Sequence, residues 1–193
     1  EFMRRYPKAK VRLEYQRPNK VYEQVLGAEV DLGIVSYPTP SPELAVTPWR
    51  SERMVVACKP GHPLAKHDAI TVEHLAGEAF ITFDRDLSIR KEVDRHLRQR
   101  SVSVAVAMEF DNIETIKQAV AIGVGISILP EPTVQMEVKA GLLCAIPLIA
   151  PELRRPLGII HRQRKVFTPT VTKFVELLHE VANGSAAAEE NHA

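Results

Sequence analysis

The chain has 193 residues, 45% of them hydrophobic and 25% charged, which excludes a disordered, collagen-like or disulfide-dense protein. Its length fits one mid-sized domain or two small lobes. The 25 Lys and Arg residues nearly balance 24 Asp and Glu residues, so the net charge of +1 excludes nucleic-acid or membrane binding through a whole-chain field. Any DNA-binding part is expected elsewhere.

The cysteines and the apolar segments narrow the class further. Cys58 and Cys144 lie far apart in the sequence and form no CxxC motif, which favours a reducing compartment and a buried thiol at each position. The longest apolar stretch, Val120 to Pro130, is interrupted by two glycines and is shorter than the ~18 residues of a membrane span. We therefore expect a protein without a membrane-spanning segment.

The first part of the chain predicts a strand, a helix and a strand. Apolar residues alternate with charged ones from Val11 to Tyr15, as in a half-buried strand. A helix is expected from Asn19 to Gly27, followed by a buried strand from Leu32 to Val35. This order predicts a parallel pair of strands. Four prolines between residues 37 and 48 predict a loop.

The rest of the chain repeats the order of strand and helix. The patterns predict strands at 54–57, 78–83, 102–110, 125–129, 142–148 and 157–161, and helices at 86–100, 113–122 and 131–140. The most regular amphipathic helix is expected from Phe167 to Val181, and residues from Asn183 onward are expected to form a solvated tail. The fold class is therefore α/β, with parallel sheets covered by helices.

Three helix starts that follow strands indicate a ligand site. They lie at Asn19, near Ser88, and at Asp111 or Asn112, and in open α/β sheets such ends share one crevice. Unpaired N–H groups there favour a small carboxylate or another oxyanion. The alternative interpretation is that Asn19, Ser88 and Asp111 only cap their own helices. Asp84, Asp86 and Asp111 would repel an anion, and Arg85 and Arg90 could offset them.

No motif in the sequence predicts catalysis, a cofactor or a metal. Gly123-Val124-Gly125 ends a helix and opens a strand, the reverse of the order in a dinucleotide-binding turn. Cys58 and His62 are not close to further metal ligands in the sequence, and no histidine has a sequence partner that would form a catalytic triad. We therefore expect no enzyme activity, no cofactor and no metal.

Several motifs, in this order, resemble the effector-binding domain of LysR-type transcriptional regulators. The most specific are Gly61-His62-Pro63-Leu64-Ala65 and Gly123-Val124-Gly125-Ile126-Ser127-Ile128-Leu129-Pro130, with Arg155-Pro156-Leu157 leading into a later strand. The resemblance implies a periplasmic-binding-protein-like fold of type 2, with two Rossmann-like lobes joined by two crossing strands. Lobe I would comprise residues 1–59 and 158–193, and lobe II residues 60–157.

The resemblance also implies a site and a mechanism. The family's effector contacts fall on six residues of this sequence: Pro18, Asn19, Ser36, Phe83, Ser88 and Asn112. A small-molecule effector in the cleft between the lobes would shift the arrangement of lobes and subunits, and thereby control DNA binding by an N-terminal winged helix.

The sequence departs from the family pattern at its beginning. It starts after the family's opening strand and the Ser- or Thr-bearing loop, and it lacks the winged helix. We therefore expect self-association through an exposed sheet edge, with weak or no effector binding by this chain.

The resemblance further implies dimers, with tetramers in a full regulator, DNA contact only through the absent winged helix, no membrane partner, and a cytoplasmic location. The alternative is a periplasmic-type solute-binding protein for a small carboxylate.

Overall fold

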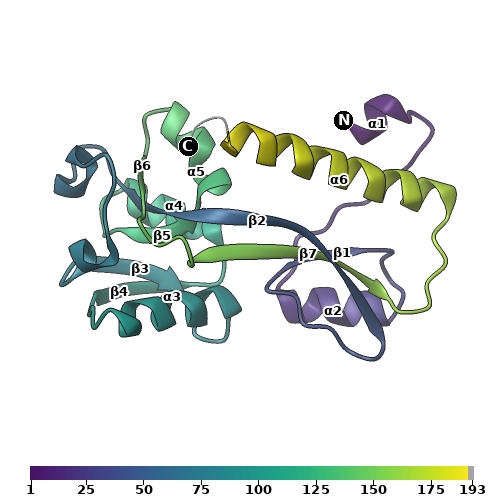
Figure 1. The fold of residues 1–193 in the computed structure, drawn as a ribbon, viewed down its shortest axis with the longest axis horizontal. Coiled ribbons are helices and arrows are strands. Elements are labelled where there is room, and N and C mark those ends of the chain that lie inside the picture. Colours follow the sequence, from purple (N-terminus) through teal and green to yellow (C-terminus); the bar gives the residue numbers. More distant parts are fainter. Residues whose placement is uncertain (191–193) are drawn as a thin grey trace. The chain divides into compact units, whose positions relative to one another are not determined.

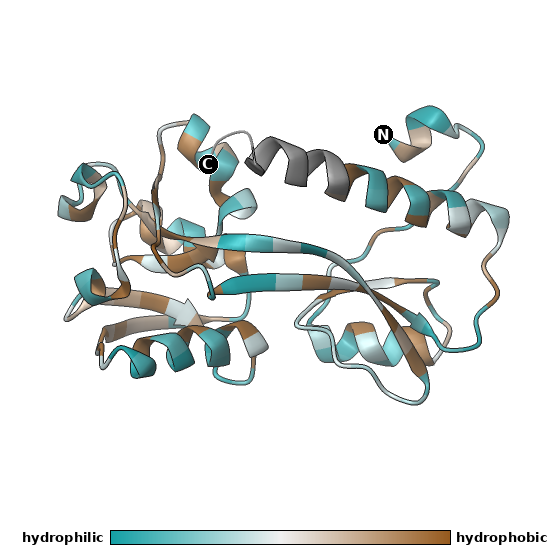
Figure 2. Cartoon of the chain, in the orientation of Figure 1, coloured by the Kyte–Doolittle hydropathy of each residue, from teal (hydrophilic) through white to brown (hydrophobic). Residues whose placement is uncertain are grey.

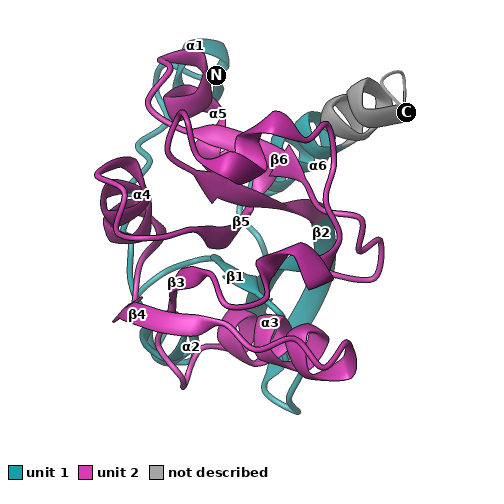
Figure 3. Cartoon of the chain, turned by 90° about the vertical axis from the view of Figure 1, so that its left-hand side faces the viewer, with its two compact units in different colours: residues 1–50, 156–193 teal, residues 51–155 magenta. Residues whose placement is uncertain are grey.

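The structure, a computed structural model, describes residues 1–190 and the side chains of residues 1–182. The chain divides into two compact units, Glu1–Arg50 with Pro156–Ala193, and Ser51–Arg155 (Figure 3). It passes between the units in strand β2 (Leu44–Cys58) and again in strand β7 (Arg154–Arg162), as Figure 1 shows. The two connecting strands are those of the periplasmic-binding-protein-like fold. The lobe limits expected after residues 59 and 157 stay a prediction.

Unit 1 contains helix α1 (Phe2–Arg5), helix α2 (Pro18–Leu26), strand β1 (Gly33–Ser36) and helix α6 (Pro169–Glu190). Strand β1 pairs antiparallel with β7, from Gly33 opposite Ile160 to Ser36 opposite Leu157. The apolar face of α2 covers this pair, because its apolar residues recur on one side of the helix. Val25, Val35, Leu44 and Ile160 form the small core of the unit.

The strand predicted from Val11 to Tyr15 is wrong, and with it the parallel pair. These residues form neither helix nor strand, and Leu13 and Tyr15 are 70% and 91% exposed. Alternation of apolar and charged residues gives a strand only where a neighbouring strand completes the backbone hydrogen bonds. Among residues 1–190, no strand pairs with this segment.

Strand β2 is much longer than the sequence predicts. It begins at Leu44 and includes Pro48, within the segment expected to be a loop. The middle of β2 is hydrophilic and its ends are hydrophobic (Figure 2). The sheet order is β1-β7-β2-β5, with β6 also paired to β2, so the neighbouring strand β7 supplies the hydrogen bonds that local propensity did not predict.

Unit 2 contains a parallel layer with helices. Strand β3 (Ala79–Phe83) pairs in parallel with β4 (Ala105–Phe110), and helices α3 (Ser88–Gln99) and α4 (Ile113–Ala121) follow these strands. This confirms the predicted repetition of strand and helix here. Two single-turn helices, η1 (Pro63–Lys66) and η2 (Val72–Leu75), precede β3. The buried core includes Phe80, Ile81, Ile116, Ile126, Ile128, Leu129 and Leu143.

The two glycines of the Gly123-Val124-Gly125 segment have structural roles. Gly123 follows α4 with a φ of 84°, a conformation that glycine adopts without steric cost. A Cβ atom on Gly125 would lie 2.3 Å from the carbonyl oxygen of Ala79. The missing side chain therefore lets the backbone lie against β3, where Ile126 exchanges hydrogen bonds of 2.8 Å with Ala79 and Ile81.

Unit 2 ends with strand β5 (Ser127–Pro130), helix α5 (Glu131–Lys139) and strand β6 (Cys144–Pro147). Both strands pair antiparallel with β2, β5 through residues 54–57 and β6 through residues 55–58 of that strand.

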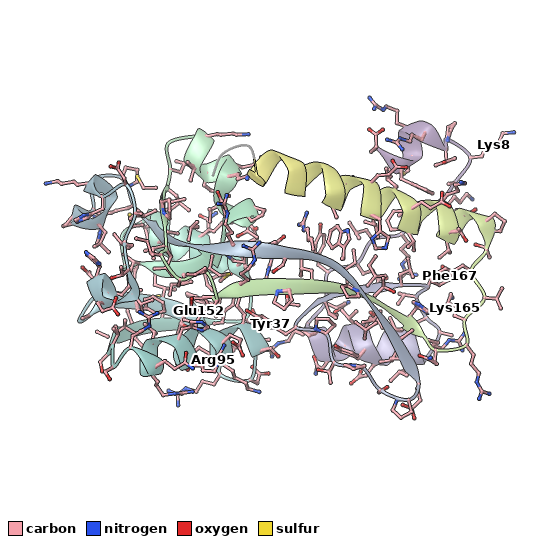
Figure 4. All side chains as sticks on the ribbon, in the orientation of Figure 1. Lys8, Tyr37, Arg95, Glu152, Lys165 and Phe167 are labelled. Carbon is pink, nitrogen blue, oxygen red and sulfur yellow. The ribbon has the colours of Figure 1, made fainter. Side chains whose placement is uncertain are left out.

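The C-terminal helix differs at both ends from the prediction. It begins at Pro169, so Phe167 lies before the helix. The Phe167 ring packs edge-on against the His161 ring, with the two ring centroids 4.8 Å apart (Figure 4). It continues to Glu190, so the predicted tail is wrong for residues 183–190, because alanine and glutamate favour helix. Residues 191–193 lie outside the described residues. No helix within residues 1–190 is long and apolar enough to cross a membrane.

Candidate functional site

In unit 1, the predicted contacts lie at the start of one helix and the end of one strand. Pro18 and Asn19 are the first two residues of α2, and both are exposed. The N-cap residue is Arg17, and its side chain makes no capping hydrogen bond. The alternative interpretation, that Asn19 caps the helix, is therefore wrong. Proline suits the first helical position because its missing N–H has no partner there.

Ser36 ends β1 and is followed by an unusual backbone conformation. Tyr37 has a φ of 50°, which side-chain-bearing residues seldom adopt, and its N–H donates to the carbonyl oxygen of Pro156 over 2.9 Å (Figure 4). The hydroxyl of Tyr22, on α2, accepts a hydrogen bond of 2.9 Å from the N–H of Thr39. The loop that follows Ser36 is therefore tied to the helix that begins with Pro18 and Asn19. No pattern in the sequence pointed to Tyr37.

In unit 2, Phe83 ends β3 and Ser88 begins α3. The Phe83 side chain is only 4% exposed, whereas Ser88 is exposed. Leu87 occupies the N-cap position of α3 and cannot cap through its side chain. The cap interpretation is therefore wrong for Ser88 as well, and its hydroxyl is not used to start the helix.

Asn112 is the N-cap of α4, a position that the alternative interpretation assigned to Asp111. Its side-chain oxygen accepts hydrogen bonds of 2.8 Å from the N–H and from the hydroxyl of Thr115. Its amide nitrogen donates to Asp111 Oδ1 over 2.8 Å. An amide nitrogen carries two hydrogens, so one remains for a further acceptor.

Arg90 connects the segments that carry these three residues of unit 2. Its side chain is 8% exposed and donates to the Phe83 carbonyl oxygen over 2.7 Å and to Glu109 over 3.1 Å. Its Nε–H is also shared between the two carboxylate oxygens of Asp94, at distances of 2.9 and 2.8 Å. One guanidinium thus holds the end of β3, the first turns of α3 and the end of β4. Sequence reasoning assigned Arg90 to charge compensation and missed this role.

Arg85 and Arg90, which were expected to offset the acidic residues around the site, both contact Glu109. Both Arg85 and Arg90 donate to Glu109, and the hydrogen bond from Arg90, followed by that from Arg85, lowers the pKa of the Glu109 carboxyl. Arg90 is therefore committed within the protein. The first turns of α2 and α3 contain no acidic residue, so the positive dipole end of each helix can attract an anion.

Each unit thus presents its predicted residues where strands end and helices begin. This is where α/β sheets bind ligands. Within residues 1–190, no group of three or more His, Cys, Asp or Glu side chains could hold a metal ion.

Two units joined by two strands, each with polar groups at strand ends, define a ligand-binding domain of the periplasmic-binding-protein type. A family model described as the LysR substrate binding domain matches residues 1–183. The chain belongs to this family.

Relatives by sequence are transcriptional regulators. The chain is 32% identical over 171 residues to the uncharacterised HTH-type transcriptional regulator YeiE of Escherichia coli K12, covering 89% of this chain and 58% of that protein. It is 29% identical over 183 residues to a probable RuBisCO transcriptional regulator of Cyanophora paradoxa, covering 91% and 56%. The chain therefore spans less than two thirds of the length of these relatives.

Solved structures share the fold. The regulatory domain of CcmR from Synechocystis PCC6803, in complex with 2-PG, matches with a TM-score of 0.81 and 28% identity, covering 94% of this chain and 87% of that one. The effector-binding domain of BenM with benzoate matches with a TM-score of 0.80 and 18% identity, covering 96% and 84%, and shows likeness of fold.

Proposed function

We propose that this chain is the effector-sensing and oligomerisation domain of a LysR-type transcriptional regulator, with units 1 and 2 as its two lobes. The observation that carries the proposal is the start of α2 and of α3. Neither helix has a side-chain cap or an acidic residue in its first turn, which leaves N–H groups and a positive dipole end for an anionic ligand.

The proposed ligand is a small oxyanion held by residues of both units. Pro18, Asn19 and Ser36 would contact it from unit 1, and Phe83, Ser88 and Asn112 from unit 2. Binding would stabilise one arrangement of the lobes and so change the spacing of DNA-binding parts. The CcmR regulatory domain was solved in complex with 2-PG, which makes 2-PG the first compound to test.

The other proposed properties belong to the longer protein that carries this domain. It would be a cytoplasmic dimer or tetramer, would contact DNA through a winged helix, and would catalyse no reaction. The relatives, which are HTH-type and RuBisCO transcriptional regulators, favour this proposal over a periplasmic-type solute-binding protein.

The test is calorimetric titration of the longer regulator with 2-PG. Ser36→Ala should weaken binding about tenfold, the effect of losing one hydrogen bond to a charged group. The control is Ser103→Ala, at an exposed serine of unit 2 outside the predicted set. Affinity for operator DNA should stay unchanged in both variants. Equal affinity of the wild type and Ser36→Ala for the ligand would contradict the assignment of Ser36.

A further inference from the structure

The two cysteines of the chain, which are far apart in the sequence, lie opposite each other in the structure. Cys58 ends β2 and Cys144 begins β6, and the antiparallel register of these strands places the two residues directly across from one another. Both thiols are free. The sequence predicted an isolated buried thiol at each position, because nothing local brings the two strands together.

This register satisfies the main spatial requirement of a disulfide. Directly opposite residues of an antiparallel pair have Cα atoms about 4.5 to 5.5 Å apart. A disulfide needs a Cα separation of about 4.4 to 6.8 Å. The two sulfur atoms can therefore meet without any change in the pairing of β2 with β6.

The two thiols differ in their access to solvent. Cys58 is 0% exposed, whereas Cys144 is partly exposed. Burial of the Cys58 thiol is the main cause that raises its pKa to about 11. The nearby Cys144 thiol, which shares a hydrogen bond with Cys58, raises this pKa further. A small oxidant should thus meet Cys144 first, and Cys58 is placed to react with the product.

We propose that Cys58 and Cys144 form a reversible disulfide, with Cys144 as the thiol that reacts with a small hydroperoxide. The Cys144 thiolate attacks one peroxide oxygen, so an S–O bond forms and the O–O bond breaks, and the leaving oxygen takes a proton to become water or an alcohol. Cys144 is then a sulfenic acid. The Cys58 sulfur attacks the Cys144 sulfur, the S–O bond breaks, and the oxygen leaves as water with the Cys58 proton. The two thiols are oxidised by two electrons and the peroxide is reduced.

The disulfide would join β6 covalently to β2. It closes a loop from residue 58 to residue 144, which contains α3, α4 and α5. Closing a long loop restricts the unfolded chain more than the folded one, so the oxidised protein should melt at a higher temperature than the reduced protein.

The test is treatment of the reduced chain with hydrogen peroxide, followed by thiol counting under denaturing conditions and by peptide mass spectrometry. The wild type should lose both thiols, lose the mass of two hydrogen atoms, and give one linked peptide that contains Cys58 and Cys144. Dithiothreitol should restore both thiols. Two remaining thiols, a separate oxidation product on each peptide, or a linkage between two chains would overturn the proposal.

Single variants assign the order of reaction. In Cys58→Ala, Cys144 should be trapped by dimedone as a sulfenic acid. In Cys144→Ala, Cys58 should lose its thiol at least about ten times more slowly than Cys144 does in the first variant. Equal rates would overturn the assignment of Cys144 as the entry thiol. Circular dichroism checks that each variant is folded. If a variant does not fold, the presence or absence of the linked peptide in the wild type still decides whether the disulfide forms.

Discussion

At the scale of single residues, buried polar groups decide the local geometry more than the exposed ones do. Arg90 is the clearest case, because its guanidinium satisfies a main-chain carbonyl and two carboxylates in unit 2. Truncating one member of such a network leaves the others desolvated and without their partner, which costs more than the network contributes as a whole.

Arg90→Met should therefore lower the free energy of unfolding by about 3 kcal/mol, measured by urea denaturation. Arg95→Met is the matched control on the same helix, because the Arg95 side chain is 46% exposed and forms a surface ion pair of 2.6 Å with Glu92 (Figure 4). The control should lose well under 1 kcal/mol. Similar losses in the two variants would contradict a special role of Arg90.

At the scale of elements, helices α4 and α5 are tied together by a buried lysine. Lys117 donates to the Glu137 carboxylate over 2.7 Å and to the Thr133 carbonyl oxygen over 3.0 Å. The hydrogen bond from Lys117 lowers the pKa of Glu137 below its usual value of 4.5. Lys117 also forms an ion pair of 2.9 Å with Glu114, whose side chain is 74% exposed.

The Glu137 contribution to stability should be complete above about pH 5 and disappear as the pH falls, because the folded protein binds this proton less readily than the unfolded chain. Urea denaturation between pH 6 and about pH 3.5 should show a smaller loss of stability in Glu137→Gln than in the wild type. Glu114→Gln, at the exposed ion-pair partner of the same lysine, is the matched control. An unchanged dependence in Glu137→Gln would show that this carboxylate does not drive the acid response.

A close approach of two elements depends on Gly125. Gly125→Ala should lower the free energy of unfolding by about 3 kcal/mol, because the new methyl group would overlap the Ala79 carbonyl oxygen at 2.3 Å. Gly141→Ala is the control, since Gly141 has a φ of 70° but open space around it, and should cost about 1 kcal/mol. Thermal and urea unfolding measure the loss of unfolding free energy in each variant. Gly125→Ala reports the cost of the steric contact, and Gly141→Ala reports the cost of the backbone conformation.

At the scale of the whole molecule, the surface of unit 1 exposes large apolar side chains. Leu13 and Tyr15 are 70% and 91% exposed, and β1 stands at the end of the sheet order among the described strands. An open sheet edge and exposed apolar side chains each favour association with another chain.

Sedimentation should therefore show self-association of this chain, and Leu13→Asp should weaken it about tenfold or more, because a charge would be buried in the interface. Val166→Asp is the control, since Val166 is also apolar and is 90% exposed. A monomeric wild type at about 100 μM, a concentration at which micromolar dimers form, would contradict the prediction.

The sequence by itself determined the features that depend on periodicity along the chain. The spacing of apolar residues placed α3, α4 and the body of α6 within a few residues of their observed bounds. The family motifs determined the class of the protein, which the match over residues 1–183 confirms. The six candidate contact residues stay a prediction, although their places at strand ends and helix starts agree with a ligand site.

Only the tertiary structure decided the features that depend on partners far away in the chain. The Val11 to Tyr15 alternation gave no strand because no neighbouring strand pairs with it among the described residues. Arg90 links the end of β3, α3 and the end of β4 because these segments converge on its side chain. Cys58 lies opposite Cys144 because β6 pairs with β2. Periodicity records which side of an element faces the core, whereas hydrogen bonds and sulfur contacts across elements depend on register, which no local pattern encodes.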